Sequence, residues 1–395
     1  MDSLPAPPVD LALTERDIVA PAQSTQAAPP DGPWIENPPW SGLDLLLLAC
    51  VVFFGIVFFS AVAVGILHGL WAQPLAEIAG NPSVWIVIPA EGAAYLVMFA
   101  VLYWLAGSRH LNWWSALSWR WPQGLSWIGF LLVGFALAFV AGLLQKILPM
   151  PKELPIEKLF LQPGAPQLLA LFGVSVAPFV EETFFRGLLY PISNRWLRNV
   201  LNSQQSLWHG GFVFLALLPW GFASVWHPPW VGSLLAVAAL ILTALFCVLR
   251  VDQGRPADAV SVIMAGVSFS VWALVASHAT RHFVEKASFG LLLVGAAMMI
   301  LGWKLQPGSV PTRIGIALSL MITALSFTLL HGEQLGESWA PLVVLLVVSS
   351  VLTLARALTK SLATSVLIHV GYNSTLFGSM YFATDHFRHL EQLTR

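Results

Sequence analysis

The sequence predicts an all-α fold, a polytopic bundle of transmembrane helices. Hydrophobic residues make up 57% of the 395 residues, charged residues make up only 10%, and the mean hydropathy is +0.75. These values lie outside the range of soluble globular proteins. The apolar residues also gather into runs near the length of about 20 residues that a helix needs to cross a bilayer. We therefore expect a multi-pass membrane protein.

The chain begins with a stretch that is unlike a membrane segment. Residues 1–41 are rich in Pro, Ala, Ser and Asp, and they lack the basic and then apolar pattern of a cleaved export signal. We expect a disordered tail here. From Leu43 onward the apolar runs predict about eleven membrane-spanning helices. Their expected bounds are 43–68, 84–106, 126–148, 166–192, 206–226, 231–250, 259–279, 287–304, 312–332, 340–357 and 361–382.

The charge pattern gives no indication of nucleic-acid binding, so the partner of the apolar runs is the lipid bilayer. The formal net charge is −1, and the Lys and Arg residues are scattered through the loops instead of forming a basic patch. Their distribution between alternate loops favours an N-terminus on the cytoplasmic side. Because the loops are short and no eukaryotic targeting signal is found, we expect a bacterial inner-membrane protein.

Three charged residues interrupt the apolar run from about residue 166 to residue 192, in the sequence Glu181-Glu182-Thr-Phe-Phe-Arg186. A charged side chain near the bilayer centre costs at least about 2.5–3.5 kcal/mol, so such a cluster indicates a functional site. On a helix Glu182 and Arg186 share a face, whereas Glu181 is rotated by about 100° from Glu182. Glu182 and Arg186 either form a structural ion pair or support the site, and Glu181 can face a cavity.

Two histidine motifs follow near the C-terminus. Phe327-Thr-Leu-Leu-His331 ends one apolar run, and His369-Val-Gly-Tyr-Asn373 lies within the last one. The spacing of four places the outer residues of each motif on one helix face. A single histidine in a membrane often only bridges helices through hydrogen bonds. Two Glu, two His and one Asn on three apolar helices, however, provide a base for water and donors for an oxyanion, as a hydrolytic site requires.

In this order, the three motifs resemble the signature of the CPBP intramembrane proteases, which include the type II CAAX prenyl endopeptidases and bacterial Abi-type proteins. The resemblance covers about residues 166–192 and 312–382. It implies a CPBP-type catalytic helix core and an intramembrane endopeptidase, classed with the metalloproteases, that hydrolyses a peptide bond of a peptide or protein substrate in or near the membrane.

The resemblance also implies a role for each motif residue. Glu181 would be the base that activates a water molecule, and His331 would help to hold that water. His369 and Asn373 would donate hydrogen bonds to the oxyanion. Glu182 and Arg186 would orient the cluster.

The chain departs from the family between the first and second motifs. The family usually connects them by a short loop, whereas this chain inserts about four spans over residues 196–311. An even number of spans returns the chain to the same side of the membrane, which is consistent with a preserved site. We therefore divide the chain into a tail (1–41), N-terminal membrane helices (42–195), inserted accessory helices (196–311) and C-terminal catalytic helices (312–395).

A metal ion is the one cofactor that the site residues suggest. Glu181, His331 and His369 are of the types that bind Zn²⁺ in catalytic sites with an open position. Asn373 is a poor zinc ligand, and a His369 nitrogen that donates to an oxyanion cannot bind a metal at the same time. We therefore expect a water activated by Glu181 without a tightly held ion, and no other cofactor.

Two other classes of function compete with the peptidase. A proton- or ion-coupled transporter would use the Glu and His residues as a relay, but it predicts internal repeats with broken helices, and none is convincing. A non-catalytic peptide-binding protein of the immunity type would keep its function after Glu181→Ala. Other hydrolase signatures, His-Glu-x-x-His and Gly-x-Ser-x-Gly, are missing.

Overall fold

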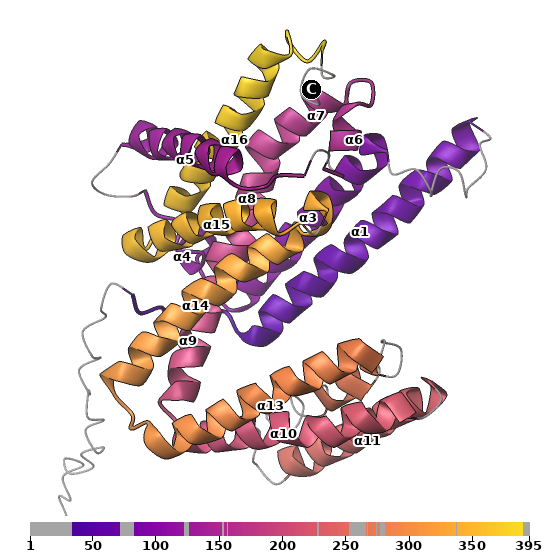
Figure 1. The fold of residues 1–395 in the computed structure, drawn as a ribbon, viewed down its shortest axis with the longest axis vertical. Coiled ribbons are helices and arrows are strands. Elements are labelled where there is room, and N and C mark those ends of the chain that lie inside the picture. The colour runs from indigo at the N-terminus through magenta and orange to yellow at the C-terminus, as the bar shows by residue number, and fades with distance from the viewer. Residues whose placement is uncertain are drawn as a thin grey trace, which may run out of the picture.

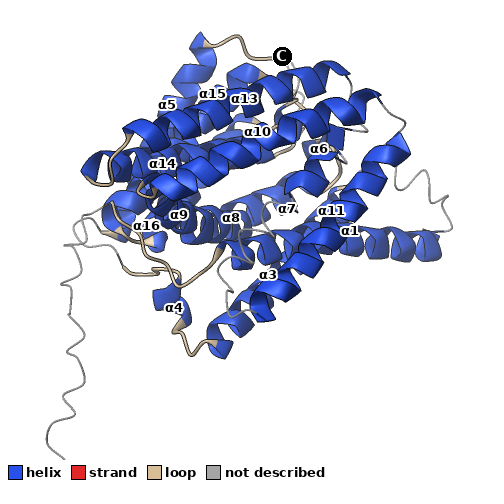
Figure 2. Ribbon diagram, turned by 90° about the horizontal axis from the view of Figure 1, so that it is seen from below, coloured by secondary structure: helices blue, strands red, loops and turns tan. Residues whose placement is uncertain are grey.

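The computed structural model confirms an all-α helical bundle. It describes residues 34–71, 83–121, 126–151, 154–155, 157–226, 229–252, 266, 268–273, 275–276, 281–336 and 338–389. Within these ranges the regular elements are helices, with no strand (Figures 1 and 2).

The helices follow in chain order with these bounds: α1 (Gly42–Trp71), α3 (Val84–Ser108), α4 (Trp113–Ala116), α5 (Trp127–Ile147), α6 (Glu157–Phe160), α7 (Ala165–Leu171), η1 (Phe172–Val176), α8 (Ala177–Glu182), η2 (Thr183–Leu189), α9 (Tyr190–Leu201), α10 (Gln204–Trp226), α11 (Pro229–Asp252), α13 (Arg281–Lys304), α14 (Ser309–Leu330), η3 (Glu333–Leu335), α15 (Trp339–Thr359) and α16 (Leu362–Ala383).

Seven helices among the described residues are long and apolar enough to cross a membrane, so the chain is a multi-pass membrane protein. The predicted count of about eleven is not confirmed. The predicted span at 259–279 falls mostly outside the described residues. The seven helices are Gly42–Leu70, Val84–Ser108, Trp127–Ile147, Ala165–Leu201, Phe283–Lys304, Ser309–Leu330 and Trp339–Thr359.

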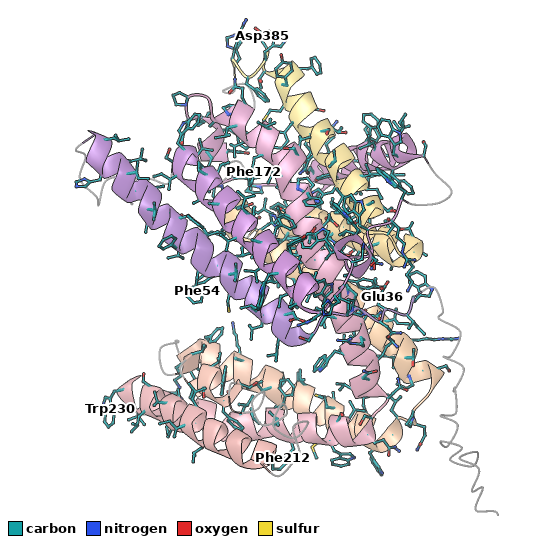
Figure 3. All side chains as sticks on the ribbon, turned by 180° about the vertical axis from the view of Figure 1, so that it is seen from behind. Glu36, Phe54, Phe172, Phe212, Trp230 and Asp385 are labelled. Carbon is teal, nitrogen blue, oxygen red and sulfur yellow. The ribbon has the colours of Figure 1, made fainter. Side chains whose placement is uncertain are left out.

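The accessory helices form a lobe of their own. Helices α10, α11 and α13, here called the insert lobe (204–304), lie to one side of the other helices (Figure 1). Figure 3 shows Phe212 and Trp230 on this lobe. The Asn202 side chain joins the two ends of the insert, because its Nδ2 donates to Thr312 Oγ1 at 3.0 Å and its Oδ1 accepts from the Gly308 amide at 2.8 Å.

The boundary predicted at residue 196 falls inside α9. This helix continues to Leu201 and packs along α14 in the main bundle. The approach is close, because a Cβ at Gly315 of α14 would lie 2.9 Å from the backbone nitrogen of Arg198. Residues on both sides of position 196 therefore belong to one helix that packs against α14.

Residues 34–41, here called the N-terminal strap, are held firmly although they belong to the predicted tail. The Trp40 side chain is fully buried, and its Nε1 donates to the Ala116 carbonyl at 2.9 Å. Arg198 donates to the Glu36 carbonyl at 2.6 Å, and the Glu36 carboxylate pairs with Arg356 at 2.9 Å. These contacts fix the end of the predicted tail, and residues 1–33 lie outside the described part.

Helices α5 and α16 cross at two glycines. A Cβ at Gly134 would overlap the Ile368 carbonyl, and a Cβ at Gly371 would overlap the Leu131 carbonyl. Small residues allow such close approach of helices in a membrane. Gly371 lies two residues from both His369 and Asn373, so this crossing sets the position of the last motif.

Candidate active site

The two glutamates lie on an irregular part of one long helix. The helix runs from Ala165 to Leu201 without a break, and the short α8 within it lies between two π-helical stretches, η1 and η2. Wider π-helical turns inside α-helices are frequent at functional sites. Glu181 and Glu182 are the last two residues of α8, and Arg186 lies on η2.

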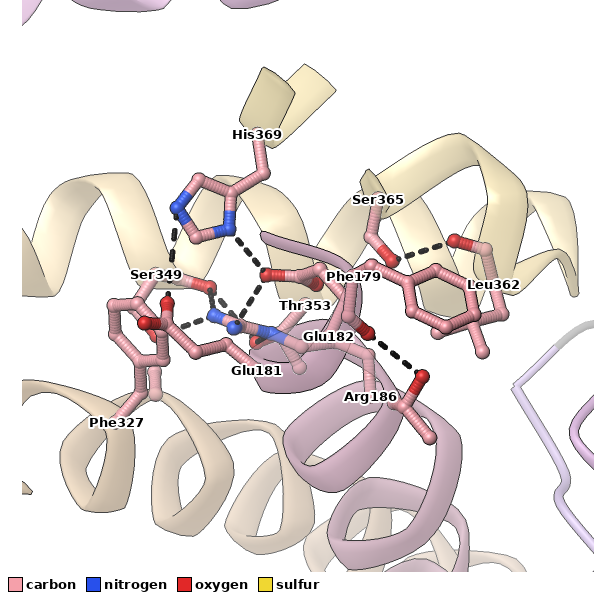
Figure 4. Close-up of polar contacts among 12 residues, drawn as sticks. Phe179, Glu181, Glu182, Arg186, Phe327, Ser349, Thr353, Leu362, Ser365 and His369 are labelled. Atoms are coloured by element: carbon pink, nitrogen blue, oxygen red, sulfur yellow. Dashed lines mark hydrogen bonds and ion pairs between the residues drawn. The ribbon is translucent and has the colours of Figure 1, made fainter. Parts of the chain in front are cut away.

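Glu182 and Arg186 form the ion pair that their spacing predicts. Arg186 Nη1 lies 2.9 Å from Glu182 Oε1, and both side chains are fully buried (Figure 4). The guanidinium also donates from Nη2 to Ser349 Oγ at 2.6 Å and from Nε to Thr353 Oγ1 at 3.3 Å. Its centre is 4.5 Å from the centroid of the Phe327 ring. The pair therefore connects the Glu helix to both α14 and α15.

The same Glu182 oxygen holds His369. His369 Nδ1 lies 2.9 Å from Glu182 Oε1, and the imidazole is almost fully buried (Figure 4). A carboxylate that is paired with Arg186 accepts hydrogen bonds, so Nδ1 is the donor. The bond fixes the ring and leaves Nε2 to face the rest of the site. Glu182 thus supports the site as well as the packing of the helices.

His331 is fixed by a hydrogen bond to its own helix. Its Nδ1 lies 2.8 Å from the Phe327 carbonyl oxygen, and the two rings are 4.6 Å apart between centroids. A carbonyl only accepts hydrogen bonds, so Nδ1 carries a proton and Nε2 of the neutral ring is an acceptor. The predicted contact between Phe327 and His331 is confirmed.

Glu181 lies between the two histidines. Its Oε1 is 3.8 Å from His331 Nε2, and its Oε2 is 3.9 Å from His369 Nε2. Both distances exceed the upper limit of about 3.2 Å for a good hydrogen bond, so neither contact is a direct hydrogen bond. The side chains of Glu181 and His331 are 20% and 19% exposed, so this part of the cluster is open, unlike the buried ion pair behind it.

Asn373 is placed apart from this cluster. Its Nδ2 donates to the Gly173 carbonyl of η1 at 2.6 Å. Gly173 has no side chain, so α16 can lie close to η1 here. A Cβ at Gly173 would lie 2.7 Å from the ring of Phe377, which is on α16 like Asn373. The structure thus brings Glu181, Glu182, Arg186, His331 and His369 into one cluster, with Asn373 one helical turn beyond His369.

The metal ligands that the sequence suggests do not form a metal site as they stand. Across the described part of the chain, no group of three or more His, Cys, Asp or Glu side chains is placed to hold a metal ion. Two ligands of one zinc ion in a tetrahedral site lie about 3.4 Å apart, whereas Glu181 is 3.8 Å and 3.9 Å from the two histidines. The expectation of a water activated by Glu181 without a tightly held ion stays a prediction.

Sequence reasoning missed three residues of this region. Glu91 lies on α3, which packs against the Glu helix through the stacked rings of Phe99 and Phe179. It is the one charged residue in the range 84–108, so the rule that identified Glu181 also applies to it. Ser349 and Thr353, which hold Arg186, are polar residues on an apolar helix. Their spacing of four places them on one helix face, and this pattern in the sequence points to a buried polar contact.

One comparison with known proteins bears on these motifs. Residues 300–375 match the family model described as type II CAAX prenyl endopeptidase Rce1-like. The match spans both histidine motifs and is consistent with the CPBP resemblance, whereas α8 and its glutamates lie outside it. No curated protein and no solved structure matches the chain.

Proposed function

We propose that this chain hydrolyses a peptide bond in or near the membrane through a water activated by Glu181. The match of residues 300–375 to the type II CAAX prenyl endopeptidases supports a CAAX-protease-like intramembrane endopeptidase at the level of the family. One observation carries the proposal: the two oxygens of Glu181 face His331 Nε2 and His369 Nε2 at 3.8 Å and 3.9 Å. The two histidines lie inside the family match, and the geometry adds Glu181, which lies outside it.

The first step is attack by the water. A water between Glu181 and His331 donates one proton to the carboxylate and the other to the lone pair of Nε2, which leaves an oxygen lone pair for the substrate carbonyl carbon. The Phe327 carbonyl holds the His331 ring in the tautomer that this step needs. Glu181 then takes the proton of the attacking water.

His369 is proposed to stabilise the oxyanion that forms. Its Nδ1 donates to Glu182, so Nε2 donates to an oxyanion when the ring carries both protons. The Glu182 carboxylate compensates that positive charge at 2.9 Å. A donor held in place in a site of low water content stabilises developing charge strongly.

Asn373 is proposed as a second donor. Its amide nitrogen has two hydrogens, and the bond to the Gly173 carbonyl uses one of them. That bond also fixes the side chain, so the second hydrogen has a defined direction. In this proposal Gly173 is a positioning residue for Asn373.

The proposed partner is a peptide or a membrane-protein segment, and the proposed location is a bacterial inner membrane. The experiment is comparative peptidomics of membranes from cells that carry the native protein, Glu181→Ala or the control Glu285→Ala. Glu285 is exposed on α13 in the insert lobe. We expect peptide fragments that disappear with Glu181→Ala alone. Identical peptides in all three samples contradict the proposal, and proton or ion flux in liposomes that depends on Glu181 without cleavage favours a transporter.

A further inference from the structure

Helix α15 carries none of the motif residues, yet two of its side chains contact the ion pair of the site. Ser349 and Thr353 are buried, and their spacing of four places them on one helix face. Arg186 Nη2 donates to Ser349 Oγ at 2.6 Å and to the Ser349 carbonyl at 3.0 Å, and Nε donates to Thr353 Oγ1 at 3.3 Å (Figure 4). Two of the three guanidinium nitrogens are therefore bound to α15.

These contacts fix the orientation of the guanidinium group. Thr353 Oγ1 donates its own hydrogen to the Ser349 carbonyl at 2.8 Å, so it meets Arg186 Nε as an acceptor. The ring of Phe327 covers one face of the guanidinium, with its centroid 4.5 Å from the central carbon. The bonds to α15 and the ring together leave the group little freedom to turn.

Arg186 has one nitrogen left for Glu182. An ion pair of Arg with a carboxylate frequently has two parallel N–H···O bonds, and these need two of the three nitrogens. Because Nη2 and Nε bond to α15, the carboxylate receives its bond from Nη1, at Oε1 and 2.9 Å. Glu182 Oε2 is buried and has no hydrogen-bond partner among the described residues. The pair therefore has a single bond where two are common.

The single bond keeps a Glu182 oxygen beside His369. Oε1 accepts from Arg186 Nη1 and from His369 Nδ1, both at 2.9 Å. A second bond from Arg186 to the unpaired Oε2 would rotate the carboxylate and move Oε1 away from the imidazole. The bond to His369 therefore depends on α15, which occupies the other donors of Arg186.

We propose that Ser349 and Thr353 are positioning residues for His369, which act through Arg186 and Glu182. This inference rests on the proposed function, in which His369 Nε2 donates to the oxyanion. The two hydroxyl groups prevent a bidentate ion pair and so keep the Glu182 carboxylate in the orientation that holds the imidazole. A displacement of about 1 Å in a site can cost about 100-fold in rate, so this indirect contact affects catalysis.

The first test removes both hydroxyl groups with little change in volume, in Ser349→Ala combined with Thr353→Val. The probe is a farnesylated CAAX-type peptide. We expect kcat per folded molecule to fall about 100-fold and KM to stay within about threefold, because the lost contacts act on the transition state alone. Thr353→Ser keeps its hydroxyl and should retain native kcat. Ser350→Ala is the matched control, because Ser350 Oγ donates to the Leu346 carbonyl of its own helix at 2.7 Å.

A second test needs no substrate. The double variant should lower the unfolding midpoint in detergent less than Glu182→Gln does, because Arg186 gains Oε2 as an acceptor in exchange for the lost hydroxyl groups. In the native protein the hydrogen-bonded Nδ1 proton of His369 should give a downfield NMR signal, which His369→Gln identifies by its absence. We expect the double variant to lose this signal and Ser350→Ala to keep it.

The outcomes that overturn the proposal are distinct. Native kcat in the folded double variant, or an unchanged Nδ1 signal, overturns the positioning role and leaves the proposed function intact. A loss of kcat in Ser350→Ala as large as that in the double variant also overturns it, because general damage to α15 then explains both. If the native protein does not cleave the probe, the proposed function fails for this class of peptide, and the NMR signal still decides whether α15 positions His369.

Discussion

Two buried Glu–Arg ion pairs, one in the site and one outside it, differ in how they arise and in what they hold. Glu182 with Arg186 and Glu36 with Arg356 both have N–O distances of 2.9 Å. The first pair joins neighbours on one helix, whereas the second joins residues 320 positions apart. Each also has a buried atom without a hydrogen-bond partner among the described residues, Glu182 Oε2 and Arg356 Nε.

Both pairs act on α15, but on different parts of it. Arg186 donates to Ser349 and Thr353, and Arg356 follows Thr353 by three residues. Only the first pair also holds a histidine of the site, through the bond from Glu182 to His369. Burial of an ion pair therefore does not by itself assign it to the site. The bond from Glu182 to His369 is what distinguishes the first pair.

The largest effect is expected next to the first pair. Glu181→Gln removes the proposed base, so cleavage should fall about 10³-fold, within the range for general base catalysis. The unfolding midpoint in detergent should not change, because Glu181 makes no close ion pair and is 20% exposed. Near-native cleavage by well-folded Glu181→Gln would overturn its assignment as the base.

Breaking the first pair should affect both stability and activity. Glu182→Gln leaves the buried Arg186 guanidinium uncompensated, a change that typically costs about 3–5 kcal/mol of unfolding free energy. His369 also loses its anionic partner, so the remaining folded protein should cleave poorly. Chemical unfolding in detergent and a cleavage assay measure the two effects.

A double variant is the control for this second effect. Glu182→Gln with Arg186→Met removes both charges, and it should recover much of the stability but not the activity. An unchanged unfolding midpoint in Glu182→Gln alone would contradict the structural role of the pair.

Breaking the second pair should affect stability alone. Glu36→Gln removes the partner of Arg356 but leaves the contact between Lys360 and the Ile35 carbonyl in the N-terminal strap. We expect a loss of about 3–5 kcal/mol of unfolding free energy, because the buried Arg356 guanidinium is left uncompensated. Cleavage per folded molecule should equal that of the native protein. If Glu36→Gln lost activity as Glu182→Gln does, the distinction between the two pairs would be wrong.

Removing the insert lobe should have a smaller effect when the junction respects α9. Asn202 contacts both Gly308 and Thr312, so a short flexible linker from Asn202 to Gly308 should leave the bundle folded and active. A junction from Asn194 to Thr312, which matches the boundary predicted from sequence, also removes the Arg195 and Arg198 contacts to the N-terminal strap and should fold poorly.

Crosslinking distinguishes the two deletions. Cysteines in place of Glu181 and His331, whose side chains are 3.8 Å apart, should react with each other in the first deletion. The lobe is part of the catalytic core if neither deletion allows that crosslink.

The smallest effect is expected from metal removal. Protein purified in a chelator should hold far less than one metal ion per chain and still cleave its substrate, and added Zn²⁺ should not raise the rate. Stoichiometric Zn²⁺ that is lost together with activity in Glu181→Ala, His331→Ala and His369→Ala would contradict this prediction.

What the sequence by itself determined was local. The apolar runs predicted an all-α membrane bundle, and a spacing of four residues predicted the pair of Glu182 with Arg186 and the contact of Phe327 with His331. These contacts depend only on the geometry of one helix, so they can be derived without knowing its neighbours. The intramembrane charges and the two histidine motifs also indicated which residues to bring together.

The tertiary structure alone decided which helices meet and what else faces the site. Glu36 and Arg356 are distant in sequence, so no local pattern relates them. Ser349 and Thr353 lie on another helix from Arg186, and only the packing of α15 against the Glu helix brings them together. The physical reason is that helix periodicity sets the direction of a side chain, whereas close packing between helices, as at Gly134 and Gly371, decides what that side chain meets.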